Sequence, residues 1–172
     1  MVSSCPIIDF NFQSVKPYTT KQDFGTVENI ENGDGIVITG NAWKYISYDI
    51  EITSETVIEF DFKSTQEGEI HGIGIDNNNS YSNTQVFNLY GTSSWGINDY
   101  TNYSGSGEYE HFVIPLGEYF SGAYNRITFA ADHDASPHNG NSFFKNVKIY
   151  NGDCQPAATT GCLLYTSPSP RD

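Results

Sequence analysis

The sequence predicts an all-β protein, an antiparallel two-sheet β-sandwich of the jelly-roll type. Residues with high helix propensity are scarce, since Leu89 and Leu116 are the only leucines before residue 162. Apolar and polar residues alternate over short runs, and Gly- and Asn-rich turns such as 32–35 and 104–107 separate these runs. Short strands at this spacing favour two packed sheets, and an open barrel is the alternative arrangement.

Nine runs with a two-residue period are expected to be strands. In chain order they are 6–12, 35–39, 43–50, 56–63, 69–76, 85–90, 109–114, 126–131 and 143–150. The clearest is 56–63, where Ile58, Phe60 and Phe62 alternate with charged residues. One face of this strand would therefore be buried and the other exposed to solvent. The polar, turn-rich segments 77–84 and 132–141 are expected to be long loops.

The length of 172 residues suits one domain, which is expected to span 6–153. Residues 154–161 have the composition of the start of an interdomain linker, which fits a gene that continued into a further module. Residues 162–172 resemble the translation of a common transposase sequencing adapter, as in a metagenomic read, and are assigned no function. The alternative is a natural Pro- and Ser-rich terminus.

Without that tail the chain keeps two cysteines, Cys5 before the first expected strand and Cys154 after the last. The first and last strands of a sandwich often lie near one another, so we expect a Cys5–Cys154 disulfide, which persists only in an oxidising compartment. Two unrelated thiols are the alternative.

The charge and hydropathy of the chain exclude several partners. The formal net charge is −13, whereas affinity for nucleic acids and anionic lipid surfaces rests on clustered Lys and Arg. The longest apolar runs are far shorter than the roughly 20 residues that cross a bilayer. Residues 1–20 lack a basic start followed by an apolar core, so no intact signal peptide is expected.

The chain contains Gly-Asn-Ala-Trp-Lys at 40–44, Ala-Asp-His-Asp at 131–134 and the segments 59–64, 68–76, 89–92, 95–96, 114–117 and 146–147. Together these motifs resemble the jelly-roll carbohydrate-binding modules of secreted bacterial polysaccharide-degrading enzymes. The resemblance implies a secreted, non-catalytic module that binds polysaccharide, is joined to a catalytic module in the same chain, and often holds a structural calcium ion.

The composition is also suited to sugar binding, because sugars stack their C–H faces on aromatic rings and pair their hydroxyls with polar side chains. The chain has 12 Tyr, 11 Phe and 2 Trp. Trp95, within a turn-rich stretch, is the leading platform, with a core tryptophan as the alternative. Trp43 begins a strand, which favours packing at the core or sheet edge, and it stays a candidate beside Tyr90 and Tyr100.

The run 69–76 places Ile70, Gly72, Gly74 and Asp76 on one face of a strand. Two glycines on one face predict either a shallow groove that ends at Asp76 or a bulged, tightly packed strand. His71, on the opposite face, is either a ligand contact or a half-buried, hydrogen-bonded histidine.

A calcium site is expected in the acidic loop that begins at Asp132. Asp132 and Asp134 are the candidate ligands, with Asp76 as a third, since Ca²⁺ binds carboxylate and carbonyl oxygens gathered from loops. An acidic loop that is only solvated is the alternative. No HExxH or paired-cysteine motif supports zinc.

An enzyme is the rival class. Glu-Ile-His at 69–71 is similar to the Gln-Ile-His motif of jelly-roll alginate lyases, which implies His71 with Tyr119 or Tyr124 in β-elimination. The net charge of −13 opposes a polyanionic substrate. A glycoside hydrolase needs a carboxylate pair, for which the candidates are Glu59, Asp61, Glu69 and Asp76. A structural or adhesive surface module is the third class.

Overall fold

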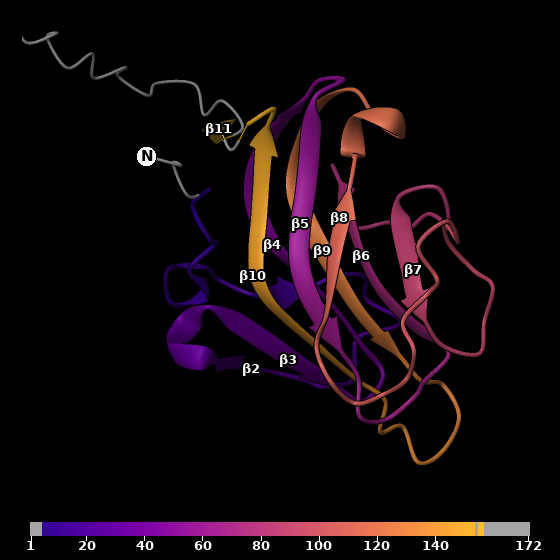
Figure 1. Cartoon of the computed structure of the whole chain (residues 1–172). Helices are drawn as coiled ribbons and strands as arrows, with labels where there is room; N and C mark the ends of the chain where they lie inside the picture. The colour runs from indigo at the N-terminus through magenta and orange to yellow at the C-terminus, as the bar shows by residue number, and fades with distance from the viewer. Residues whose placement is uncertain (1–4, 154, 157–172) are drawn as a thin grey trace, which may run out of the picture.

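The computed structural model describes residues 5–153 and 155–156, whose strands are joined by turns and long loops (Figure 1). One sheet contains, in spatial order, β1 (Lys16–Pro17), β4 (Ala42–Ile52), β9 (Gly122–Asp132), β6 (Ile70–Asp76) and β7 (Val86–Tyr90). The other contains β2 (Thr26–Ile30), β3 (Gly35–Thr39), β10 (Asn141–Asn151), β5 (Thr56–Lys63) and β8 (Glu110–Ile114), and β11 (Gln155–Pro156) pairs with β10.

The two sheets form a β-sandwich in which every pair of neighbouring strands is antiparallel. From β1 to β10 the chain crosses from one sheet to the other at every link except those from β2 to β3 and from β6 to β7. This repeated crossing is the jelly-roll pattern. The predicted fold class is therefore confirmed.

Helical structure in the described residues is limited to three 3₁₀ turns, which are η1 (Phe10–Phe12), η2 (Glu31–Gly33) and η3 (Leu116–Glu118). None of the helices is long and apolar enough to cross a membrane. The predicted strand at 6–12 is wrong, because Asp9 caps η1 by accepting from the Asn11 backbone N–H at 2.9 Å. Ile8 and Phe10 are buried all the same, which explains the apolar pattern of this run.

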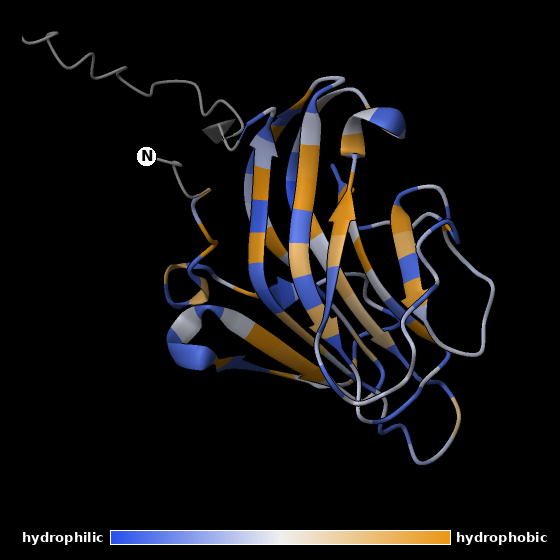
Figure 2. Cartoon of the chain, in the orientation of Figure 1, coloured by the Kyte–Doolittle hydropathy of each residue, from blue (hydrophilic) through white to orange (hydrophobic). Residues whose placement is uncertain are grey.

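The core lies between the sheets and is rich in aromatic rings. Strand β5 alternates buried and half-buried residues along its whole length, and Figure 2 shows the matching alternation of hydropathy. Phe129 of β9 and Phe144 of β10 meet across the sandwich with ring centroids 5.2 Å apart. The remaining predicted runs coincide with β3–β10 to within a few residues, whereas β1, β2 and β11 were not predicted.

A second apolar cluster covers the outer face of the five-stranded sheet. Its buried members are Tyr18, Trp43, Ile70, Val86 and Ala130, with Tyr45 and Trp95 packed against them. A sheet face that is packed with rings instead of polar side chains needs loops to cover it. The loops at this face therefore position the candidate site described below.

The two glycines of β6 do not form an open groove. A Cβ on Gly74 would lie 2.2 Å from the Gln85 carbonyl oxygen, and one on Gly72 would lie 2.8 Å from Val86 Cγ1. The register between β6 and β7 also shifts next to Gly72. The glycines thus allow the neighbouring strand to approach closely. This is the bulged, tightly packed strand that the sequence predicted as the alternative to a groove.

The predicted Cys5–Cys154 disulfide lies partly outside the described residues, because Cys154 is not among them. Cys5 is buried. Most of the expected linker and all of residues 162–172 also lie outside the described residues. The disulfide and the adapter-like origin of the tail stay predictions.

His71 is a core residue with a fixed tautomer. Its Nε2 accepts from the Gly68 backbone N–H at 2.7 Å, so Nδ1 carries the proton and donates to Ser142 Oγ at 2.9 Å. The Ser142 hydroxyl donates to the Ala130 carbonyl at 2.8 Å. Burial lowers the pKa of His71 from 6.5 to about 4. A backbone hydrogen bond at Asn141 raises the pKa by less than burial lowers it.

We expect this buried imidazole to make the protein less stable in mild acid. Because the folded-state pKa lies below the unfolded value, the unfolded chain binds the proton first as the pH falls from 6.5 to about 4. The free energy of unfolding then falls by up to about 3 kcal/mol from this group. Urea unfolding at several pH values checks this, with His71→Gln expected to flatten the pH dependence in this window.

The control is His138→Gln, which removes an exposed histidine from a loop. It should leave the pH dependence of the wild type in place. Equal slopes for the wild type and His71→Gln would contradict the account of His71.

Candidate functional site

A pocket of about 260 Å³ opens at the end of the five-stranded sheet where β4 begins and β9 ends. The chain reaches it from several directions, since β6 also begins there and the segment after β7 contributes further residues. The lining residues are Gln22, Trp43, Glu69, Ile70, Tyr81, Ser93, Trp95, Asp132 and Asp134. It therefore combines aromatic rings and carboxylates in one place.

Three aromatic rings form one wall of the pocket. The Trp43 ring centroid lies 5.6 Å from that of Trp95, at right angles, and 5.6 Å from that of Tyr81. Tyr81 and Trp95 are 5.7 Å apart. Trp43 is 2% exposed, whereas Tyr81 is 41% exposed and Trp95 is partly exposed. The two accessible rings therefore both pack against the buried ring of Trp43.

Trp43 is positioned by the sheet and by a buried hydrogen bond. It is the second residue of β4 and pairs with Ala130 of β9. Its indole Nε1–H donates to Asp132 Oδ1 at 2.8 Å. Asp132 is the last residue of β9 and pairs with Ile70 of β6. This bond ties the aromatic wall to the acidic wall.

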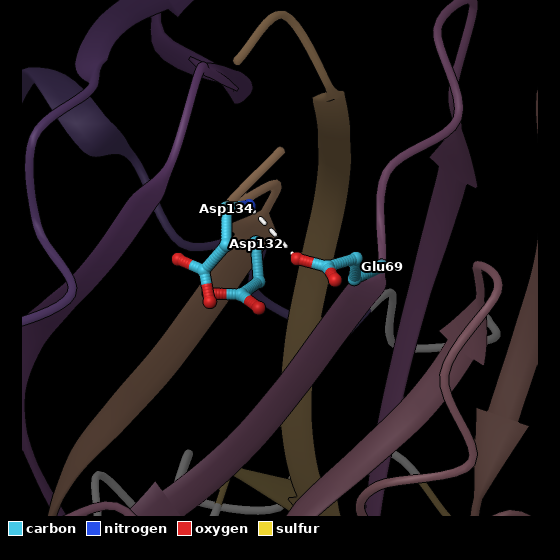
Figure 3. A group of neighbouring side chains, drawn as sticks. All are labelled: Glu69, Asp132 and Asp134. Carbon is cyan, nitrogen blue, oxygen red and sulfur yellow. Dashed lines mark hydrogen bonds between the residues drawn. The ribbon is translucent and has the colours of Figure 1, made fainter. Parts of the chain in front are cut away.

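Glu69, Asp132 and Asp134 form the acidic wall, with one oxygen from each within 4.8 Å of the others (Figure 3). Glu69 Oε2 accepts from the Asp134 backbone N–H at 2.8 Å. Asp134 Oδ1 accepts from Asn41 Nδ2 at 2.6 Å. In the described part of the chain, each of the three carboxylates accepts its hydrogen bond through one oxygen. The second oxygen of each can therefore coordinate a cation or accept a hydrogen bond from a ligand.

The electrostatics of this wall favour a proton or a cation. Burial is the main cause that raises the pKa of Asp132, and the neighbouring Asp134 and Glu69 carboxylates raise it further. The hydrogen bond from Trp43 opposes this rise. A bound cation, or hydroxyl groups that donate to these oxygens, would relieve the repulsion between the carboxylates.

The donor set fits Ca²⁺. It consists of carboxylate oxygens, which this hard cation prefers, and Ca²⁺ completes a shell of six to eight oxygens with carbonyls or water. The structure brings Asp132 and Asp134, the expected ligands, together, but the third carboxylate beside them is Glu69 and not Asp76. Asp76 lies six residues along β6 from Ile70, fully buried, and accepts from the Tyr18 hydroxyl.

Two of the expected ligand-binding aromatics line the pocket, and two do not. Trp43 and Trp95 are in its wall. Tyr90 packs against His71 and Tyr103, and Tyr100 packs against Phe87 and Tyr119. Both tyrosines therefore cover the sandwich, which is the common role of tyrosine on a sheet.

The structure corrects the expected ligand contacts of His71 and Asp76, because both are fully buried. The lyase arrangement also fails, since His71 faces the core and the Tyr119 hydroxyl donates to Asp99 at 2.7 Å. Of the expected hydrolase carboxylates, Glu59 and Asp61 both contact the imidazole of His111, on β8 of the other sheet. Only Glu69 reaches the pocket.

Sequence reasoning missed Tyr81 as a site residue and did not place Glu69 with the acidic loop. Tyr81 is the one aromatic residue of the polar segment 77–84, and an isolated ring in a polar loop was an available signal. The position of Glu69 beside Asp134 could not be predicted from the sequence, because it depends on the pairing of β6 with β9.

Comparison with protein-family models found no matching family, and comparison with curated proteins found no match. Among solved structures, the chain is similar to a family 29 carbohydrate-binding module at 15% identity and a TM-score of 0.43, covering 75% of each chain. It is similar to a carbohydrate-binding module of Cellvibrio mixtus lichenase 5A in complex with cellotriose at 13% identity and a TM-score of 0.37, covering 86% of this chain and 95% of that chain.

A further similarity is to the glycoside hydrolase domain of endo-D from Streptococcus pneumoniae R6, at 11% identity and a TM-score of 0.47. It covers 82% of this chain, which spans only 21% of the length of that one. At these identities the similarities assign no ligand to this chain.

We expect Trp43→Phe to destabilise the protein by about 2 kcal/mol, because the buried Asp132 carboxylate loses its indole donor. The pKa of Asp132 should rise further. Urea unfolding measures the stability, and carboxyl NMR titration measures the pKa. The same substitution should cost less in an Asp132→Asn background, where the acceptor is uncharged, and an equal cost in both backgrounds would contradict the assignment.

Proposed function

We propose that this protein binds polysaccharide without catalysis, and that the pocket of Trp43, Tyr81 and Trp95 is its binding site. The observation that supports this most is the junction of an aromatic wall with free carboxylate oxygens in one open pocket. Aromatic faces stack on the C–H surface of a sugar ring, and carboxylates accept hydrogen bonds from its hydroxyls. Gln22 and Ser93 add neutral polar groups to the same pocket.

The charge of the chain limits the glycan and the other partners. Asp and Glu number 21 against 8 Lys and Arg, which opposes binding to polyanionic glycans, nucleic acid and anionic membranes. A neutral polysaccharide suits both the pocket and the net charge of −13. We therefore include neutral glycans as the first probes.

In the proposed role the module is secreted and holds an appended catalytic module close to its polysaccharide. The gain from such tethering is a higher effective concentration of enzyme at the substrate. The linker-like composition of residues 154–161 supports an appended module. A structural or adhesive module of a surface protein is the alternative role, and it requires no glycan in this pocket.

We expect Trp95→Ala to weaken polysaccharide binding about tenfold or more, because a partly exposed aromatic ring in a pocket carries a large share of binding energy. Affinity electrophoresis and pull-down with a panel of neutral soluble and insoluble polysaccharides measure this. Tyr81→Ala should have a similar effect.

The matched control is Tyr109→Ala, which removes a partly exposed ring that packs against Lys63 and Lys145 on the other sheet. It should bind as the wild type does. Binding that Trp95→Ala and Tyr81→Ala leave unchanged would place the glycan elsewhere, and no binding to any polysaccharide would favour the structural or adhesive role.

Calcium is part of the proposal, with Glu69, Asp132 and Asp134 as the ligands. A bound Ca²⁺ would neutralise their repulsion and tie the loop that follows β9 to the start of β6. At a free concentration one hundred times Kd, it should raise the free energy of unfolding by about 2.7 kcal/mol. Thermal denaturation with CaCl₂ and with EDTA measures the effect.

Asp134→Asn should abolish the calcium effect, whereas Asp61→Asn, which changes a carboxylate on the other sheet, should keep it. A melting temperature that is the same in CaCl₂ and EDTA would reject the calcium site and leave the aromatic pocket unaffected.

Glycoside hydrolysis is the second candidate function. Carboxylate oxygens of Glu69 and Asp132 lie within 4.8 Å, and retaining glycosidases hold their carboxyl groups roughly 5–5.5 Å apart. The raised pKa of Asp132 suits a group that protonates the leaving oxygen, with Glu69 as the partner carboxylate. New reducing ends that disappear in Asp132→Asn would establish this reaction, and Ca²⁺ on the same oxygens would inhibit it.

A further inference from the structure

A second hollow lies beside the aromatic pocket and shares a residue with it. It measures about 380 Å³ and is lined by Phe24, Gly40, Asn41, Asp134 and His138. Asp134 lines both hollows. Pockets for small organic ligands measure roughly 300–1,000 Å³, so each hollow alone is at or below the low end of that range.

Phe24 gives the second hollow an accessible aromatic face. Its side chain is 76% exposed, and no other aromatic ring of the described residues packs against it. An apolar side chain that is this exposed contributes little to the free energy of folding through burial. It is therefore available to stack on a ligand.

The backbone that carries Phe24 is fixed to the strand that carries Trp43. The Phe24 backbone N–H donates to the Asn41 carbonyl at 2.7 Å. The preceding Asp23 accepts from the Trp43 backbone N–H at 3.2 Å and pairs with Lys44 at 2.8 Å. The backbone segments that carry the aromatic platforms of the two hollows are thus held together, which lowers the entropy cost of binding a ligand across both.

Asn41 joins the segments that meet between the hollows. Its Nδ2 donates to Asp134 Oδ1 at 2.6 Å and to Gln22 Oε1 at 3.3 Å. Its Oδ1 accepts from the His133 backbone N–H at 3.4 Å. Gln22 lines the first hollow and Asn41 the second, so the border between them consists of hydrogen-bonding groups and not of an apolar barrier.

The floor of the second hollow depends on glycine. Gly40 has a φ of +97°, which side-chain-bearing residues rarely adopt. A Cβ at this position would lie 3.3 Å from both Gly25 Cα and the His138 carbonyl oxygen. A side chain at this position would therefore be strained and would crowd the backbone of Gly25 and His138 beside the hollow.

We infer that the two hollows are adjoining subsites of one groove, and that the ligand is a chain of at least two sugar units. One unit lies against Tyr81 and Trp95, the chain passes Asp134, and a further unit lies on Phe24. This inference rests on the proposed function and specifies its ligand as a stretch of chain, as opposed to a single terminal sugar.

The lining also indicates that the chain is uncharged. Among the described residues that line either hollow there is no Lys or Arg, whereas Glu69, Asp132 and Asp134 are acidic. In the absence of bound Ca²⁺, a uronate unit would meet these carboxylates without a cationic partner. Neutral hydroxyl groups can instead donate to the free carboxylate oxygens.

The test is calorimetric titration of the full chain with neutral oligosaccharides of two to six units from the cello-, xylo- and manno- series. Affinity of the wild type should rise with chain length by about tenfold, which corresponds to one additional stacked unit at about 1.4 kcal/mol. Phe24→Ala should remove most of that rise and leave the affinity for the shortest bound oligosaccharide unchanged.

Phe12→Ala is the matched control, because Phe12 is 85% exposed and lines neither hollow. It should retain the rise with chain length, and Trp95→Ala should lose binding at every length. If the wild type binds but affinity is independent of length, or Phe24→Ala behaves as Phe12→Ala does, the second subsite is rejected and the proposed function stands. If no oligosaccharide binds at any length, both are rejected.

Discussion

The hydrogen bond from the Trp43 indole to the Asp132 carboxylate connects the fold to the candidate site. It joins the start of β4 to the end of β9 at 2.8 Å, and it holds a buried carboxylate beside a buried ring. A buried acceptor that keeps its donor costs little, whereas one that loses it destabilises the fold. The site is thus built on the rigid end of a sheet, which suits a binding surface that has to be preorganised.

The position of this bond follows from the second apolar cluster. The outer face of a five-stranded sheet in a sandwich is commonly wet, but here Tyr18, Trp43 and Val86 make it apolar. Tyr81 and Trp95 cover part of this face without burying it completely, since both stay partly exposed. The same packing that stabilises the sheet therefore leaves an aromatic wall open to a ligand.

The sequence predicted most strands and the sandwich, because their two-residue period survives in β5 and its neighbours. It failed at 6–12, where Asp9 caps a turn, and at β2, where only two of five residues are even partly buried. Trp43, Trp95, Asp132 and Asp134 were predicted individually, but their meeting in one pocket depends on strand pairing between distant segments. His71 follows the hydrogen-bonded alternative that the sequence left open, and Asp76 is buried as well. Alternation assigns a residue to a face and does not show what covers that face.

The chain contains only two tryptophans, and both line the pocket, which offers a direct test of the central claim. In a ¹⁵N-labelled protein the two indole N–H signals report separately on Trp95 and on the Trp43 bond to Asp132. We expect both signals to shift during titration with a neutral oligosaccharide that the protein binds, with saturation at the same concentration as the calorimetric titration. Saturable binding that leaves both indole signals unmoved would contradict the account.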